Sequence, residues 1–163
     1  MRAFLLLAFL ATPTVAQDFE FSTAAFESCL AGLAPGEDAR ACIGASADAC
    51  MATEAGGTTV GMGACLSREL TYWDDRLNRV YRAAMTKARA IDAEMDGLGS
   101  AAPQQAPALR DMQRAWITFR DAKCDHARSL WGGGTGGGPA TYDCLMRTTG
   151  EQVMYLEKLA LGD

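Results

Sequence analysis

Apolar side chains recur at intervals of three and four residues along most of the chain, which is the spacing of one face of an α-helix. The longest run begins after Thr58 or Thr59 and continues to about residue 98. Its apolar positions are Leu66, Leu70, Trp73, Leu77, Val80, Ala84, Ala88, Ile91, Met95 and Leu98. Most charged residues of this segment fall outside that stripe, so the pattern predicts one long amphipathic helix.

Four shorter segments have the same periodicity, at residues 22–33, 37–55, 108–131 and 142–161. Glycine and proline pairs, such as Pro35-Gly36 and Gly56-Gly57, separate them and favour turns. No segment alternates strictly between β-branched and polar residues. The pattern therefore predicts an all-α fold, an antiparallel bundle of four to five helices with short connections. We expect a small N-terminal helical extension at residues 17–56 and a main helical domain at residues 57–163.

Aromatic and aliphatic residues on the predicted stripes are candidates for the core. They are Trp73 and Leu77 on the long helix, and Trp116 and Phe119 on the helix at residues 108–131. Arg120 follows these aromatics directly. A guanidinium beside aromatic rings can join two helices through cation–π contacts and ion pairs. We therefore expect Arg120 to reach Asp74 or Asp75 on the long helix.

The first 16 residues have the pattern of an export signal. Arg2 precedes an apolar run at residues 3–11, and Thr14-Val15-Ala16 forms a small-x-small cleavage site. The run is too short to cross a bilayer as a helix. The alternative is a buried N-terminal helix. The pattern favours a periplasmic or secreted chain with no stable membrane anchor.

In an exported chain, six cysteines indicate a disulfide framework. Two cysteines flank each predicted turn at similar distances, and they therefore lie at similar heights on the two arms of a helical hairpin. A bridge between Cys42 and Cys50 is disfavoured, because eight residues of helix span ~12 Å. The spacing predicts pairing in sequence order, namely Cys29–Cys42, Cys50–Cys65 and Cys124–Cys144.

Charge and residue types argue against several classes of function. The formal net charge of −5 disfavours nucleic acid and anionic membranes as partners. A single histidine, His126, and the absence of C-x-x-C spacing give no basis for a metal site, and no cofactor motif is present. Asp121 and Asp125 share a helix face, which leaves a small hydrolase as a remote alternative. A solvated helix face explains them better, and we expect no enzyme activity.

A glycine-rich segment, W-G-G-G-T-G-G-G-P, occupies residues 131–139. It lacks the Gly-Lys-Ser/Thr ending of a phosphate-binding loop. One interpretation is a flexible spacer between two helices, and the other is a recognition loop that approaches a partner closely. Trp131 could equally anchor a partner or close the core beneath the loop. The candidate contact residues are Trp131, Gly133, Gly134, Thr135 and Gly136.

Three blocks of the sequence resemble the lysozyme inhibitor LprI-like N-terminal family. The first runs from Cys50 through Cys65 to Met85, and the third joins the glycine loop to Cys144 and the last helix. The second is the fairly specific run Q-R-A-W-x-x-F-R-D-x-x-C, which ends at Cys124. The resemblance implies an exported, disulfide-stapled helical domain. The pair Cys29 and Cys42 is additional to the family pattern.

The resemblance also suggests a function, which is binding and inhibition of lysozyme or a related cell-wall-cleaving enzyme. Many lysozymes are basic, and a net negative charge steers a chain toward basic partners. The alternative is a structural or interaction module of the cell envelope with no enzyme target.

Overall fold

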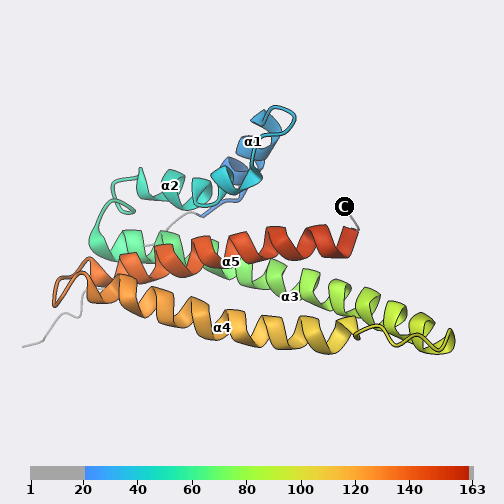
Figure 1. Ribbon diagram of the computed structural model, residues 1–163. Coiled ribbons are helices and arrows are strands. Elements are labelled where there is room, and N and C mark those ends of the chain that lie inside the picture. Colours follow the sequence, from blue (N-terminus) through green and yellow to red (C-terminus); the bar gives the residue numbers. More distant parts are fainter. Residues whose placement is uncertain (1–20, 162–163) are drawn as a thin grey trace, which may run out of the picture.

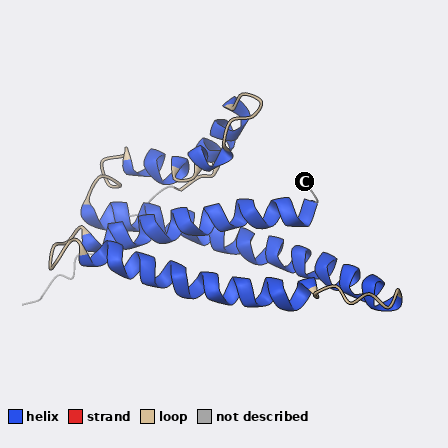
Figure 2. Cartoon of the chain, in the orientation of Figure 1, coloured by secondary structure: helices blue, strands red, loops and turns tan. Residues whose placement is uncertain are grey.

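The computed structural model describes residues 21–161, and every regular element in this range is a helix (Figures 1 and 2). The predicted signal segment at residues 1–16 lies outside the described residues. The elements are α1 (Ala24–Gly32), the 3-10 turn η1 (Ala39–Cys42), α2 (Ala45–Met51), α3 (Thr59–Gly97), α4 (Gln105–Ser129) and α5 (Gly137–Leu161). The prediction of an all-α, disulfide-stapled bundle is confirmed.

The three long helices form the body of the molecule. Figure 1 shows α4 running antiparallel to both α3 and α5. Helix α2 lies over the first part of α3, and α1 packs against α2 and η1. The core lies beneath this cover. Trp73 and Leu77 belong to it as predicted, and the ring of Phe26 from α1 stands edge-on to Trp73 at a centroid distance of 4.9 Å. The two short N-terminal helices are thereby packed onto the long ones.

The predicted helix at residues 37–55 is wrong as one element, because the chain turns at Gly44. This residue has a φ of 101°, a left-handed conformation that favours glycine. A Cβ atom there would also lie 2.9 Å from Arg147 Nη2 of α5, so the Arg147 side chain would have to shift. The segment becomes η1 followed by the short helix α2.

Helices α4 and α5 begin earlier than the sequence pattern predicts. Pro107 and Pro139 lie in their first turns, where a missing N–H costs no helical hydrogen bond. The start of α4 is also capped from outside, since the Asp92 carboxylate accepts from the backbone N–H groups of Gln105 and Ala106 at 2.6 and 2.8 Å. The Asp92 side chain of α3 thus stabilises a start of α4 that precedes Pro107.

The assignment of Phe119 to the core is wrong, since its side chain is 60% exposed. Helix α4 is rotated so that Gln113, Arg120 and Cys124 face inward instead. The Gln113 side-chain oxygen accepts from Gln152 Nε2 at 2.9 Å, and this pairing allows a polar residue in the interface. Trp116 is partly buried against the core.

The predicted lock at Arg120 is confirmed. Its guanidinium lies 5.1 Å from the ring centroid of Trp116 and 3.7 Å from Asp74 Oδ1. Burial raises the pKa of Asp74, although Arg120 opposes the shift. The charged form of Asp74 is therefore less favourable in the folded chain than in the unfolded one.

We predict that Asp74→Asn slightly raises the melting temperature at pH 7. An aspartate whose folded pKa is raised is destabilising above that pKa, and protonation removes the effect as the pH falls. The gain should stay below about 1 kcal/mol, because the Asp74 side chain is half exposed. Thermal unfolding of the parent and the variant, compared between about pH 3 and pH 7, tests this, because an ordinary aspartate titrates at about pH 3.9. A variant that melts below the parent at pH 7 contradicts it.

The three disulfides join the cysteines in the predicted order. The Cα–Cα distances are 5.6 Å for Cys29–Cys42, 5.7 Å for Cys50–Cys65 and 5.4 Å for Cys124–Cys144. Each is within the range that a bridge requires. The bridges therefore close three successive hairpins, as the spacing predicts.

Candidate partner-binding surface at the loop end of the bundle

One end of the bundle carries the α4–α5 connection and the start of α3 (Figure 1). We call it the loop end and define it by Val60, Leu130, Tyr142 and residues 131–136. Its apolar side chains are solvent-exposed, with Leu130 at 73% and Trp131 at 54%. Tyr142 lies beside Gly63 of α3, which ties the two helix starts together. Large exposed apolar groups gathered in one place are typical of contact surfaces.

The glycine segment forms a hydrogen-bonded turn. The Trp131 carbonyl accepts from Gly134 N–H at 2.9 Å, and the Gly134 carbonyl accepts from Gly137 N–H at 3.2 Å. Gly132 has a φ of 55°, which reverses the chain after α4. Successive hydrogen bonds therefore lead directly from α4 into α5, and Thr135 is left exposed between them.

Trp131 rests on the backbone of this turn. A Cβ atom added at Gly136 would overlap the six-membered ring of Trp131, and one at Gly137 would lie 3.5 Å from the Trp131 Cβ atom. Glycine at position 136 is thus required for the ring to lie where it does. By contrast, a Cβ atom at Gly133 would meet nothing within 4 Å. The indole is held in one place while half of its surface remains open to solvent.

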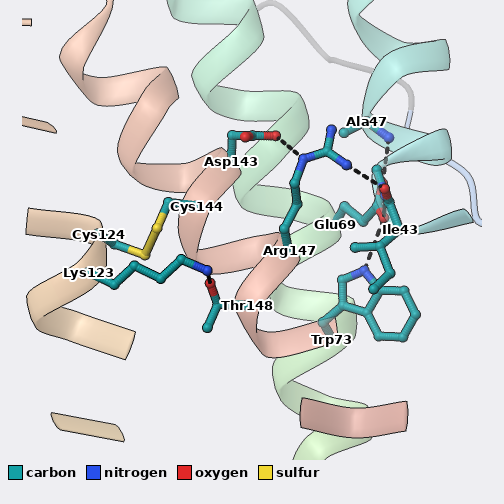
Figure 3. Close-up of polar contacts among 11 residues, drawn as sticks. Ile43, Ala47, Glu69, Trp73, Lys123, Cys124, Asp143, Cys144, Arg147 and Thr148 are labelled. Carbon is teal, nitrogen blue, oxygen red and sulfur yellow. Dashed lines mark hydrogen bonds and ion pairs between the residues drawn. A yellow bond between two sulfur atoms is a disulfide. The ribbon is translucent and has the colours of Figure 1, made fainter. Parts of the chain in front are cut away.

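The base of the loop end is fixed by a bridge and by polar contacts, shown in Figure 3. Cys124 of α4 is bonded to Cys144 of α5, and Lys123 Nζ donates to Thr148 Oγ1 at 3.0 Å beside it. Both contacts join α4 to α5 within the first turns of α5. The turn that carries Trp131 therefore projects from a rigid pair of helices.

Arg147 joins the same part of α5 to the N-terminal segment (Figure 3). Its Nε atom pairs with Asp143 Oδ1 at 2.8 Å, and its Nη1 atom donates to the Ile43 carbonyl at 2.8 Å. That carbonyl lies just before Gly44, where the chain turns into α2. One side chain thus links α5 to the start of α2.

Glu69 is a buried carboxylate that the sequence pattern placed among the surface charges. It accepts from the N–H groups of Gly44 at 2.7 Å and Ala47 at 2.6 Å, and from Trp73 Nε1 at 3.0 Å (Figure 3). Two of these donors are backbone amides at the N-terminus of α2, so Glu69 caps that helix from α3. The i, i+4 spacing of Glu69 and Trp73 was the one signal of this role in the sequence.

The remaining candidate groups lie on the surface of α4. His126, Asp121 and Asp125 are exposed, and Asp121 pairs with Arg120 Nη2 at 2.8 Å. In the part of the chain that the structure describes, no group of three or more histidine, cysteine, aspartate or glutamate side chains could hold a metal ion. Within the same residues, no helix is both long and apolar enough to span a membrane.

Residues 50–156 match the model of the family described as lysozyme inhibitor LprI. The chain belongs to the LprI family. The match covers α3, α4, α5 as far as residue 156, and the two disulfides Cys50–Cys65 and Cys124–Cys144. It begins after the bridge Cys29–Cys42, which closes a hairpin outside the LprI match.

Two curated relatives of this LprI protein are themselves uncharacterised. The chain is 24% identical over 135 residues to the "Uncharacterized 17.7 kDa protein in puhA 5'region" of Rhodobacter capsulatus, with 82% of this chain and 83% of that protein covered. It is 30% identical over 95 residues to "Uncharacterized protein R02472" of Rhizobium meliloti (strain 1021), with 58% of this chain and 68% of that protein covered. No solved structure matches the chain. Family membership and three disulfides together suggest an extracytoplasmic protein.

Proposed function

We propose that this LprI-family chain is a periplasmic or secreted inhibitor of lysozyme or a related cell-wall-cleaving enzyme, and that the loop end makes the contact. The observation that carries the assignment to the loop end is the half-exposed indole of Trp131, held against the turn at Gly136. A pre-ordered aromatic side chain loses little conformational freedom on binding. Tryptophan is also enriched among the residues that dominate binding energy.

The charge distribution supports the same arrangement. Most glycosidases act through a pair of carboxylates that flank the scissile bond. The last turn of α4 carries His126 and Arg128, while the first turns of α3 and α5 contain no acidic residue. The starts of α3 and α5 and the end of α4 lie here, so two positive helix ends outweigh one negative end. The loop end therefore suits an acidic cleft, while the net charge of −5 steers the whole chain toward a basic enzyme.

The oxidised chain is expected to inhibit lysis of cell-wall substrate at near-stoichiometric ratio with at least one type of lysozyme. Trp131→Ala should raise the inhibition constant at least about tenfold, because truncation of a buried aromatic anchor typically costs about 2–4 kcal/mol of binding free energy. Phe119→Ala is the matched control, because Phe119 is an exposed aromatic on the side of α4. Equal inhibition by both variants would place the contact away from the loop end.

Two glycine variants test whether inhibition depends on the position of the Trp131 ring. Gly136→Ala displaces the Trp131 ring, whereas Gly138→Ala lies outside the loop end and has open space around it. The first should weaken inhibition and the second should leave it unchanged, with the helical circular dichroism preserved in both. If neither the parent nor any variant inhibits or binds a lysozyme, the envelope interaction module becomes the better assignment.

A further inference from the structure

A cleft of about 650 Å³ lies between α5 and the turn that joins α1 to η1. This volume is within the range of small-molecule sites. Its polar and aromatic lining comes from Glu37, Asp38, Arg40, Glu151, Tyr155, Glu157 and Lys158. Of these, Glu157 pairs with Arg76 Nε at 2.7 Å. Tyr155 lies 18 residues after the first residue of α5, about 27 Å along the helix axis. The cleft is therefore well separated from the loop end.

The wall opposite α5 is pre-ordered. The Cys29–Cys42 bridge closes the hairpin that carries it, and the Glu37 carboxylate accepts from the Ala34 N–H at 2.8 Å. Asp38 accepts from the Arg40 backbone N–H at 3.0 Å and from its Nε atom at 2.7 Å. The Arg40 hydrogen bond lowers the pKa of Asp38 to about 2, so this carboxylate is ionised at physiological pH.

The two walls have different origins. Glu151, Met154 and Tyr155 fall within the LprI match at residues 50–156, whereas residues 36–40 precede it and Lys158 lies two residues beyond its end. The hairpin stapled by Cys29–Cys42 thus places a charged rim over a helix of the family domain. An extension held by its own disulfide creates a concave surface that α5 alone would lack.

The lining mixes donors, acceptors and one aromatic face. Glu37, Asp38 and Glu151 present acceptors, Arg40 and Lys158 present donors, and the Tyr155 ring is 50% exposed among them. An anionic ligand would meet repulsion from the carboxylates, which outnumber the cations. A cationic ligand would have to compete with Arg40 and Lys158, which already lie close to Asp38. Sugar hydroxyls both donate and accept hydrogen bonds, and charged partners strengthen those bonds. The apolar face of a pyranose ring can pack on the tyrosine.

We propose that this cleft binds a neutral oligosaccharide. The site is distinct from the loop end and does not depend on the inhibitory function. A bound glycan would lie along α5, with one sugar on Tyr155 and its hydroxyl groups between the η1 side and Lys158. Oligosaccharides of glucose and of N-acetylglucosamine share this chemistry, and the test compares the two sources.

The test is a titration of the full oxidised chain with maltohexaose and, separately, with chitohexaose, followed by NMR shifts of backbone amides. We expect saturable shifts at residues 36–40 and 151–158 with at least one of the sugars. Tyr155→Ala and Arg40→Gln should each weaken binding about tenfold, the loss expected for a stacking contact or a charge-assisted hydrogen bond. Arg40 is exposed, so its replacement leaves the fold intact.

Two control variants show whether the loss of binding is specific to the cleft. Tyr142→Ala removes an exposed tyrosine at the opposite end of α5, and Lys87→Gln changes the apolar groove that shares Tyr155 with the cleft. Both should bind the glycan like the parent. Absence of shifts with either sugar up to about 10 mM, or equal affinity of the Arg40 and Lys87 variants, would overturn the proposal. If the parent chain binds the glycan but inhibits no lysozyme, the proposed function is refuted and the glycan proposal stands.

Discussion

Glu69→Gln is expected to lower the free energy of unfolding by about 3 kcal/mol. Glu69 is 1% exposed, and its two oxygens receive three donors from Gly44, Ala47 and Trp73. A glutamine offers one oxygen and one amide group, so at least one buried N–H would face another donor. An unsatisfied buried polar group costs about 1–3 kcal/mol, and more where a charged acceptor is lost.

Urea denaturation of the oxidised chain, followed by circular dichroism, measures this effect. Glu94→Gln is the matched control, because Glu94 is an exposed glutamate on the same helix, and its change should stay within about 0.5 kcal/mol. The reason for the larger effect is that Glu69 caps the N-terminus of α2, whereas Glu94 is exposed. If the Glu69 variant unfolds at the same urea concentration as the parent, α2 does not depend on this cap.

Removal of the Cys124–Cys144 bridge by paired serine substitution should cost about 3 kcal/mol, the loop-closure estimate for a separation of 20 residues. This bridge lies at the base of the loop end. Its loss should therefore also release the turn that carries Trp131 and weaken inhibition, even at temperatures where the chain remains folded.

The paired serine variant of Cys29 and Cys42 is the control. Its separation of 13 residues predicts a similar loss of stability. Because this bridge lies outside the loop end, inhibition should persist in the folded variant. Thermal melts and lysis assays on both variants measure the two effects. Equal inhibition by both would show that rigidity at the base of the loop end is unimportant.

Periodicity and cysteine spacing were sufficient to predict the three long helices and the three bridges. Both signals are local, since each depends on residues within one helix or one hairpin. The inward face of α4 was not predictable in the same way. Phe119 fits an apolar stripe, but the side chains that face inward include Gln113 and Arg120, whose partners Gln152 and Asp74 lie on other helices.

The break at Gly44 and the role of Glu69 escaped prediction for the same reason. A glutamate on an amphipathic helix normally faces water, and burial became favourable only because α2 presents free amides to it. At the loop end, the glycine content was evident from sequence. The support that Gly136 gives to Trp131 depends on a contact across the turn, which composition alone does not reveal.

The three bridges follow one another along the chain without crossing, at separations of 13, 15 and 20 residues. In a chain that enters an oxidising compartment N-terminus first, each cysteine meets its proper partner before the next pair has arrived. Few wrong pairs can then form at any moment, and reshuffling, which takes seconds to hours, is rarely needed. The order of the cysteines therefore suits oxidation during translocation, with little dependence on a disulfide isomerase.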